Sequence, residues 1–184
     1  RLSKSNSISA LQDLVDYHDA PVATTTYFVH SLLSRSISVK KFRVAFSGTA
    51  ADELFTGYYD HFNLHLYEMR NHPRFAEFVS DWKRHTGTFV RNPFLKDPEL
   101  YMKDQSIRDH IYLDNEDFKS YLRTPFTEGF KEEYFTDSLL RNRMLNELFH
   151  ESTPVILHED DLNSMFYSIE NRSPFLDTRL FDFA

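Results

Sequence analysis

A short run of small and acidic residues is the part of the sequence best suited to chemistry. Residues 47–53 read SGTAADE and directly follow the apolar run FRVAF at 42–46. If that run is a strand and the next residues open a helix, the turn between them presents backbone N–H groups, which bind anions. Asp52 and Glu53 would lie in the first helical turn, where carboxylates can hold a Mg²⁺ ion that bridges phosphates. The simpler alternative is a capped helix start, in which both carboxylates only complement the helix end.

The elements that must position this loop are expected to be mostly helices. Apolar residues recur at intervals of three and four, the period of an amphipathic helix. The strand candidate is 42–46. A lone strand would leave its backbone donors and acceptors unpaired, so we expect its partner strands elsewhere, for example upstream of Arg1. The expected helices are residues 7–20, a helix from Thr24, 51–69 with an interruption near Gly57, 75–86, a helix capped by Thr136 and Asp137, and 160–169 after Pro154.

Composition narrows the class of function. The 184 residues include 21 basic and 28 acidic side chains, a formal net charge of −7. This balance argues against nucleic-acid and membrane-surface binding, which need basic faces. Apolar stretches stay well below the ~18 residues of a membrane span. Cysteine is absent, which excludes a disulfide, a thiolate metal site and a cysteine nucleophile. We therefore expect a soluble cytoplasmic protein, and the start at Arg1 rather than Met suggests a piece of a longer chain.

Two further polar clusters have simpler explanations than metal binding. His61 and His65 are spaced i, i+4 beside Asp60, but a third zinc ligand in the right register is missing. We expect them on an exposed polar face of a helix. The run HEDD at 158–161 is expected to be the negatively charged start of a helix, stabilised by the helix dipole.

Two longer motifs resemble one protein family. Residues 47–58 read SGTAADELFTGY, which resembles the nucleotide loop S-G-(D/E)-G-x-D-E-L-F-x-G-Y of glutamine-hydrolysing asparagine synthetases. Residues 161–177 read DLNSMFYSIENRSPFLD, which resembles the family pattern D-x-x-x-M-x-x-S-(V/I)-E-x-R-x-P-F-L-D. A weaker likeness to an Asp-x-Pro loop lies at residues 18–21. The likeness extends over most of the chain in order, and the first two blocks are its specific part.

The resemblance implies an α/β fold. The chain would be the helix-rich portion of an adenine-nucleotide-binding domain of the ATP pyrophosphatase type, mostly α-helical with one or a few parallel strands. Residues 1–184 would form a partial synthetase domain. The family's first ATP loop, of the kind S-G-G-x-D-S, does not occur in the sequence, and neither does the glutaminase domain with its cysteine nucleophile.

The resemblance also implies a chemistry and the residues that carry it. The family amidates a carboxylate through an acyl-adenylate, using MgATP and glutamine-derived ammonia. Ser47, Gly48 and Thr49 would lie against the nucleotide phosphates, and Asp52 would bind Mg²⁺ or orient its water shell.

The second block would supply the catalytic residues. Glu170 would lie near the acyl-adenylate as a polar or acid–base group. Arg172 would help to hold negative charge, or the loop that does so. The implied partners are a small-molecule carboxylate, the glutaminase domain of the same chain and further copies in a homo-oligomer.

Two departures from the family pattern leave alternatives open. Thr49 stands where the family usually has an acidic residue, and Ala50 replaces the second glycine. The backbone at Ala50 therefore either avoids positive φ or accepts strain. The carboxylate could be aspartate or a related acid, such as a sugar acid in surface-polysaccharide synthesis. The competing hypothesis is a non-catalytic binding or assembly domain. We also expect that the 184 residues alone neither hydrolyse glutamine nor turn over ATP.

Overall fold

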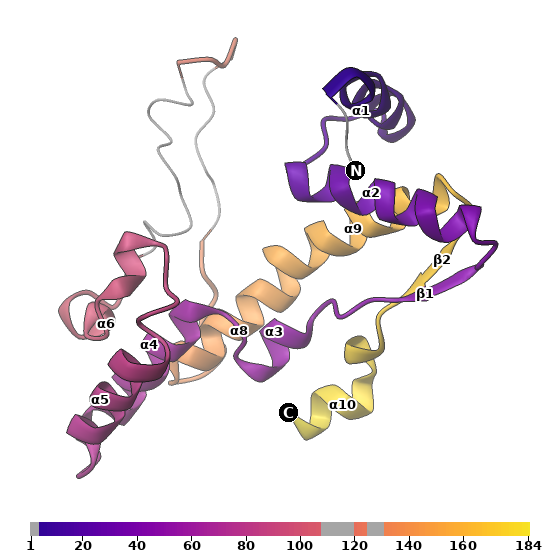
Figure 1. Ribbon diagram of the computed structural model, residues 1–184. Coiled ribbons are helices and arrows are strands. Elements are labelled where there is room, and N and C mark those ends of the chain that lie inside the picture. Colours follow the sequence, from indigo (N-terminus) through magenta and orange to yellow (C-terminus); the bar gives the residue numbers. More distant parts are fainter. Residues whose placement is uncertain (1–3, 108–119, 125–130) are drawn as a thin grey trace. The chain divides into compact units, whose positions relative to one another are not determined.

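The chain forms two compact units. The computed structural model describes residues 4–107, 120–124 and 131–184. Unit 1 comprises Arg1–Leu54 and Leu148–Ala184, and unit 2 comprises Phe55–Glu147 (Figure 1). Each unit has its own buried cluster of apolar side chains, so each is described by itself.

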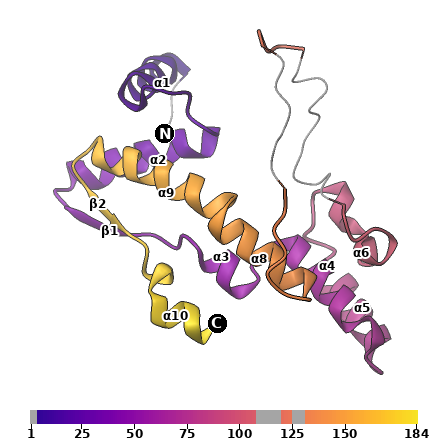
Figure 2. The same cartoon turned by 180° about the vertical axis from the view of Figure 1, so that it is seen from behind.

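Unit 1 is built around two packed helices. Helix α9 lies alongside α2 in both views (Figures 1 and 2). Asn163 Nδ2 donates to the backbone oxygen of Tyr27 at 3.1 Å, and Ser38 Oγ donates to that of Tyr167 at 3.0 Å. The first bond joins the two helices, and the second joins the end of α2 to the turn that follows α9. The helices of this unit are α1 (Lys4–His18), α2 (Thr25–Val39), α3 (Ala51–Phe55), which ends at the boundary with unit 2, α9 (Ser152–Met165), the 3₁₀ turn η3 (Pro174–Leu176) and α10 (Thr178–Phe183).

Two short parallel strands follow these two helices. Strand β1 (Val44–Phe46) comes after α2, and strand β2 (Glu170–Arg172) comes after α9. They pair in parallel, with Val44 opposite Glu170 and Phe46 opposite Arg172. At each transition a single residue takes a left-handed backbone, Lys41 at φ 65° and Ser168 at φ 56°. The fold class expected from the sequence is confirmed, since the structure is helix-rich with a small parallel sheet.

We expected the partner strands of β1 elsewhere, for example upstream of Arg1, but one partner, β2, lies within this sequence. Strand β2 reads Glu-Asn-Arg and contains no apolar residue, so it carries no strand pattern. Backbone bonds hold it nonetheless: Glu170 N donates to Arg43 O at 2.8 Å, and Ser47 N donates to Arg172 O at 2.9 Å.

Helix α9 begins earlier than the sequence suggests. It starts at Ser152 rather than after Pro154, which is the third helical residue. Proline is tolerated in a first turn, because the N–H it lacks would have no intrahelical acceptor there. The acidic run 158–161 therefore lies in the middle of the helix, and its interpretation as a helix start is wrong.

Unit 2 is a group of short helices around an apolar core. The expected break near Gly57 is confirmed, since the chain turns between α3 and α4. No helix in the described ranges has the length and apolar character to cross a membrane. The helices are α4 (Tyr59–Glu68), η1 (Met69–Asn71), α5 (Phe75–His85), η2 (Pro93–Lys96), α6 (Leu100–Lys103) and α8 (Leu139–Phe149), and the buried core is Leu64, Leu66, Trp82, Val90, Leu95, Leu100 and Tyr101.

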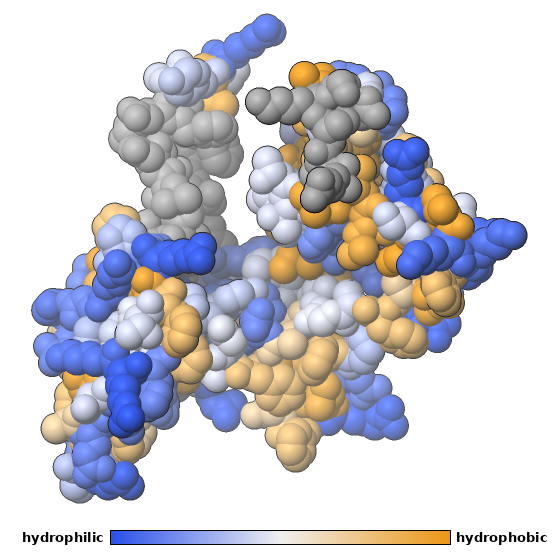
Figure 3. Space-filling model, in the orientation of Figure 1, coloured by the Kyte–Doolittle hydropathy of each residue, from blue (hydrophilic) through white to orange (hydrophobic). Residues whose placement is uncertain are grey.

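Apolar side chains also reach the surface of unit 1. Alternate side chains in β1 and just before it are exposed: Phe42 at 60%, Val44 at 39% and Phe46 at 71%. Figure 3 shows a second apolar area over α10, where Phe183 is 81% exposed.

Candidate functional site

The parallel pairing brings the two sequence motifs together in unit 1. Ser47 directly follows β1 and Ser173 directly follows β2, so both lie at the carboxyl edge of the sheet. Their hydroxyl oxygens are 3.0 Å apart, and Ser47 Oγ is also 3.0 Å from Thr49 Oγ1. In α/β proteins, ligands bind outside the carboxyl ends of parallel strands. The two motifs together thus present three linked hydroxyl groups, two from the first motif and one from the second, at the edge where a ligand is expected.

The loop that carries these hydroxyls has a constrained backbone. Ala50 adopts φ 73°, so this position keeps the left-handed conformation and accepts the strain that a glycine would avoid. Its side chain is 2% exposed and packs with Leu54, Leu148 and Phe175. Gly48 is different, because its φ is not positive and a Cβ built there meets nothing within 4 Å. The loop is therefore anchored at Ala50 and open to solvent at Gly48.

Two backbone donors of the loop have no acceptor among the described residues. The amide of Ala51 donates to Gly48 O at 3.1 Å, which closes a turn, whereas the amides of Gly48 and Thr49 donate to no described group. Helix α3 has only five residues, so its dipole is small. Anion binding here would depend on the loop amides and hydroxyls more than on the helix end.

The two carboxylates of the first motif have different environments. Asp52 is exposed on α3. Glu53 is 2% exposed and accepts a hydrogen bond from Ser152 Oγ at 2.7 Å, which ties α3 to α9. Of the two carboxylates considered for Mg²⁺, Asp52 alone is available to an ion in solution.

Glu170 and Arg172 form an ion pair on the surface of β2. Arg172 Nε donates to Glu170 Oε1 at 2.8 Å, and this bond raises the pKa of the guanidinium. Residues two apart in a strand point to the same face, so both lie on the face that also carries Val44 and Phe46. This bond uses only the Nε–H of Arg172, so an anionic ligand could bind the other N–H groups of the guanidinium, whereas freeing the Glu170 carboxylate requires the pair to open.

The structure thus brings together only part of the expected site. Ser47 and Thr49 lie beside the end of β2, next to Arg172. Glu170 begins that strand, roughly 7 Å further along it. Asp52 has no described bond to these residues. Ser173 was missed in the sequence, because its equivalence to Ser47 depends on recognising β2.

A buried polar cluster in unit 2 was also missed. His61 is fully buried, and its Nε2 lies 2.7 Å from Glu147 Oε2, so the expectation that it lies on an exposed face is wrong. His65 is exposed, as expected. Oxygen and nitrogen atoms of Asp60, His61 and Glu147 all lie within 4.8 Å of one another, a spacing that a metal ion could use.

The charges of this cluster are already compensated. Arg143 donates to Asp60 Oδ2 at 3.1 Å and to Glu132 Oε1 at 3.0 Å. Burial raises the pKa of Glu147 to about 6, although His61 opposes that rise. A guanidinium already bound to Asp60 disfavours a second cation beside it. The cluster is therefore best explained as a polar core of unit 2.

The chain as a whole matches one known family. The family model described as asparagine synthase matches residues 1–184. No curated protein and no solved structure matches the chain. Together with the two motifs that meet at the carboxyl edge of the β1–β2 sheet, this match shows that the chain belongs to the asparagine synthase family, whose enzymes are ligases that carry out ATP-dependent amidation.

Proposed function

We propose that the chain supplies the phosphate-facing loop and the amidation residues of a synthetase that converts aspartate, or a related acid, to its amide with glutamine-derived ammonia. One observation carries this proposal: the two motifs, 126 residues apart at Ser47 and Ser173, are joined by a hydrogen bond between their hydroxyl groups. That bond would place the loop and the Glu170–Arg172 pair on one small sheet.

The reaction explains why these groups are needed. A carboxylate becomes electrophilic when its oxygen attacks the α-phosphorus of ATP and pyrophosphate leaves. Negative charge then builds on the phosphate oxygens, where fixed donors are most effective. The hydroxyls of Ser47 and Thr49 and the amide of Gly48 are such donors. Asp52 would hold Mg²⁺, which neutralises phosphate charge when bound.

The amide-forming half of the reaction would give a role to each member of the Glu170–Arg172 ion pair. Ammonia attacks the acyl carbon, AMP leaves with the electron pair of the broken C–O bond, and the new nitrogen must lose a proton. We propose that Arg172 leaves Glu170 to hold the phosphate charge. The released carboxylate of Glu170 then accepts the proton.

Pyrophosphate exchange into ATP by the intact protein tests this function. We expect exchange that requires one carboxylic acid, with aspartate and a uronic acid as the first two candidates. Ser47→Ala should slow exchange at least tenfold, whereas Ser36→Ala, an exposed hydroxyl on α2, should leave it unchanged. If none of the acids tested supports exchange, and titration with MgATP releases no heat, a non-catalytic binding or assembly domain would be favoured instead.

That alternative class has a specific basis in the loop. Thr49 cannot supply the charge of the acidic residue usual at its position, and it bonds to Ser47 instead. Ala50 keeps the left-handed backbone in spite of its methyl group, so the loop retains its shape without the usual residues. A non-catalytic binding domain would keep the shape of this loop but would not turn over ATP.

The remaining parts of the proposal concern the chain's partners and its behaviour alone. We propose a small-molecule carboxylate as substrate, a glutaminase domain as the ammonia source, a cytoplasmic location and assembly into a homo-oligomer. We also propose that these 184 residues by themselves do not turn over ATP, because they contain no S-G-G-x-D-S loop. Robust pyrophosphate release by the 184-residue chain would contradict the last point.

A further inference from the structure

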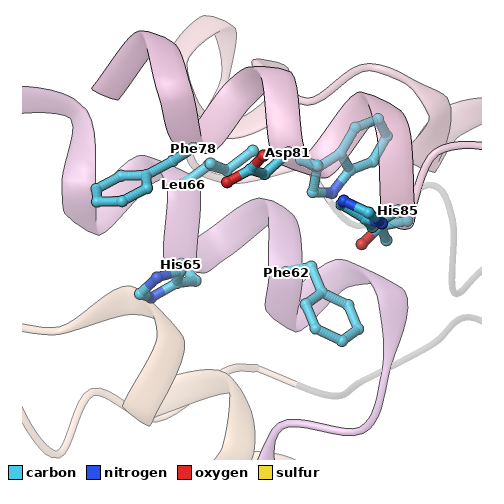
Figure 4. Close-up of a pocket in the computed structure, with 8 residues that line it drawn as sticks. Phe62, His65, Leu66, Phe78, Asp81 and His85 are labelled. Atoms are coloured by element: carbon cyan, nitrogen blue, oxygen red, sulfur yellow. The ribbon is translucent and has the colours of Figure 1, made fainter. Parts of the chain in front are cut away.

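A cavity lies wholly within unit 2, between α4 and α5. Its volume is about 240 Å³. Helix α5 contributes side chains at positions 78, 81, 82 and 85, which is the spacing of one helical face. Helix α4 contributes positions 62, 65 and 66 (Figure 4). The lining residues are Phe62, His65, Leu66, Phe78, Asp81, Trp82, His85 and Thr86.

The walls of this cavity are aromatic. Phe62 is 38% exposed, Phe78 is half-buried, and Trp82 is 6% exposed. The faces of aromatic rings carry negative potential and attract cations. The same unit already shows this attraction, since the guanidinium of Arg74 lies 5.8 Å from the centroid of the Phe78 ring.

Three side chains that line the cavity can accept from N–H donors, and the lining also includes the indole N–H of Trp82, a donor that has no described partner. Asp81 forms no hydrogen bond or ion pair with any described residue, and Figure 4 shows it reaching from α5 towards the space above His65 and Phe62. His65 and His85 lie at the same cavity, and a neutral imidazole offers one acceptor nitrogen. The charge of Asp81 raises the pKa of Arg74, but the two groups form no ion pair. A carboxylate without a direct partner, beside two such acceptors and three aromatic rings, favours a cation with several N–H groups.

We infer that this cavity binds a small primary ammonium ion that carries an aromatic or branched apolar group. The ammonium has three N–H donors, which Asp81 and the two imidazoles can accept, and the apolar group contacts the rings. The volume lies below the ~300–1,000 Å³ of pockets for drug-sized ligands, so the ligand is a small amine of the size of phenethylamine. The inference does not depend on the adenylation proposal, which rests on unit 1.

Trp82 reports directly on this cavity, because it is the single tryptophan of the chain. The 184-residue chain is titrated with phenethylamine at neutral pH while its tryptophan emission is recorded, and calorimetry gives the stoichiometry. We expect saturable binding of one amine per chain. The neutral isostere 2-phenylethanol should bind at least tenfold more weakly, because it lacks the charge that Asp81 attracts.

Two variants in unit 2 separate the cavity from general electrostatics. Asp81→Asn should raise the dissociation constant at least tenfold. Glu99→Gln removes the same charge from an exposed position that does not line the cavity, and should change the dissociation constant less than twofold. The inference is overturned if wild-type emission shows no saturation up to 20 mM amine, if the alcohol binds equally well, or if both variants lose affinity equally.

Discussion

At the scale of single residues, two of the four glycines have opposite environments. A Cβ at Gly87 would lie 2.7 Å from Cζ3 of Trp82, whereas one at Gly48 would meet nothing within 4 Å. Neither glycine has positive φ, so the difference is one of space alone.

Gly87→Ala should therefore destabilise unit 2, because the methyl group must push the buried indole out of place. We expect a loss of about 1–3 kcal/mol in the free energy of unfolding, the usual range for overpacking. Gly48→Ala should change it by less than ~0.5 kcal/mol. Urea unfolding of the two variants measures both values, and equal values would show that the contact at Trp82 relaxes freely.

The raised pKa of Glu147 predicts a pH dependence of stability. Around this carboxyl lie His61, Asp60 and Arg143, and burial raises its pKa from 4.5 to about 6. Between those values the folded state keeps a proton that the unfolded chain has released. The stability contributed by this carboxyl is therefore present below pH 4.5 and is lost as pH rises to about 6.

Glu147→Gln removes this titration. The stability of the wild type relative to the variant should fall by about 2 kcal/mol between pH 4.5 and pH 7. Chemical unfolding at both pH values gives the difference, with Glu99→Gln, an exposed carboxyl of the same unit, as control. A difference that does not change with pH would show that Glu147 keeps an ordinary pKa.

At the scale of elements, the α2–α9 pair determines where both strands lie. Asn163 is 1% exposed, and its bond to the Tyr27 carbonyl is one of the few polar contacts between the two helices. Asn163→Ala should lower the free energy of unfolding by about 1–3 kcal/mol, because it removes a buried hydrogen bond between the two helices. Asp161→Ala, at an exposed position of the same helix, is the control and should be nearly neutral. Thermal unfolding compares the two.

Helices were easier to predict from the sequence than the pairing of the strands. The stripes of apolar residues located α1, α2, α4, α5 and α8 well, because burial of one face imposes a period that the sequence must show. Strand β2 could not be found, since Glu170, Asn171 and Arg172 are exposed or half-buried and need no apolar pattern. His61 was misplaced for a related reason: its partner Glu147 lies 86 residues away.

The roles of the candidate site residues stay predictions, and the structure adds where these residues lie. The motifs named Ser47, Thr49 and Arg172, which the structure places at one edge. They did not distinguish exposed Asp52 from buried Glu53, because that difference depends on Ser152 of another helix.

At the scale of the whole molecule, the exposed face of β1 predicts self-association. Val44 and Phe46 of β1 and Phe42 just before it are all exposed, so a second copy could cover them. Phe46→Ser should lower the mass-average size measured by light scattering at micromolar concentration, and Phe89→Ser, an equally exposed ring in unit 2, should not. A size that neither variant changes would exclude β1 as the contact.

The way the chain crosses between its units has a consequence for how this protein can vary. The chain leaves unit 1 at Leu54 and re-enters it at Leu148. Both leucines belong to one buried cluster with Ala50. Because the exit and the return are neighbours, everything between them is an insertion whose removal would leave only a short gap to span. Replacing 55–147 by a few glycines and serines should leave a folded remainder, so evolution can reshape the insert without altering the hydroxyl-bearing loop.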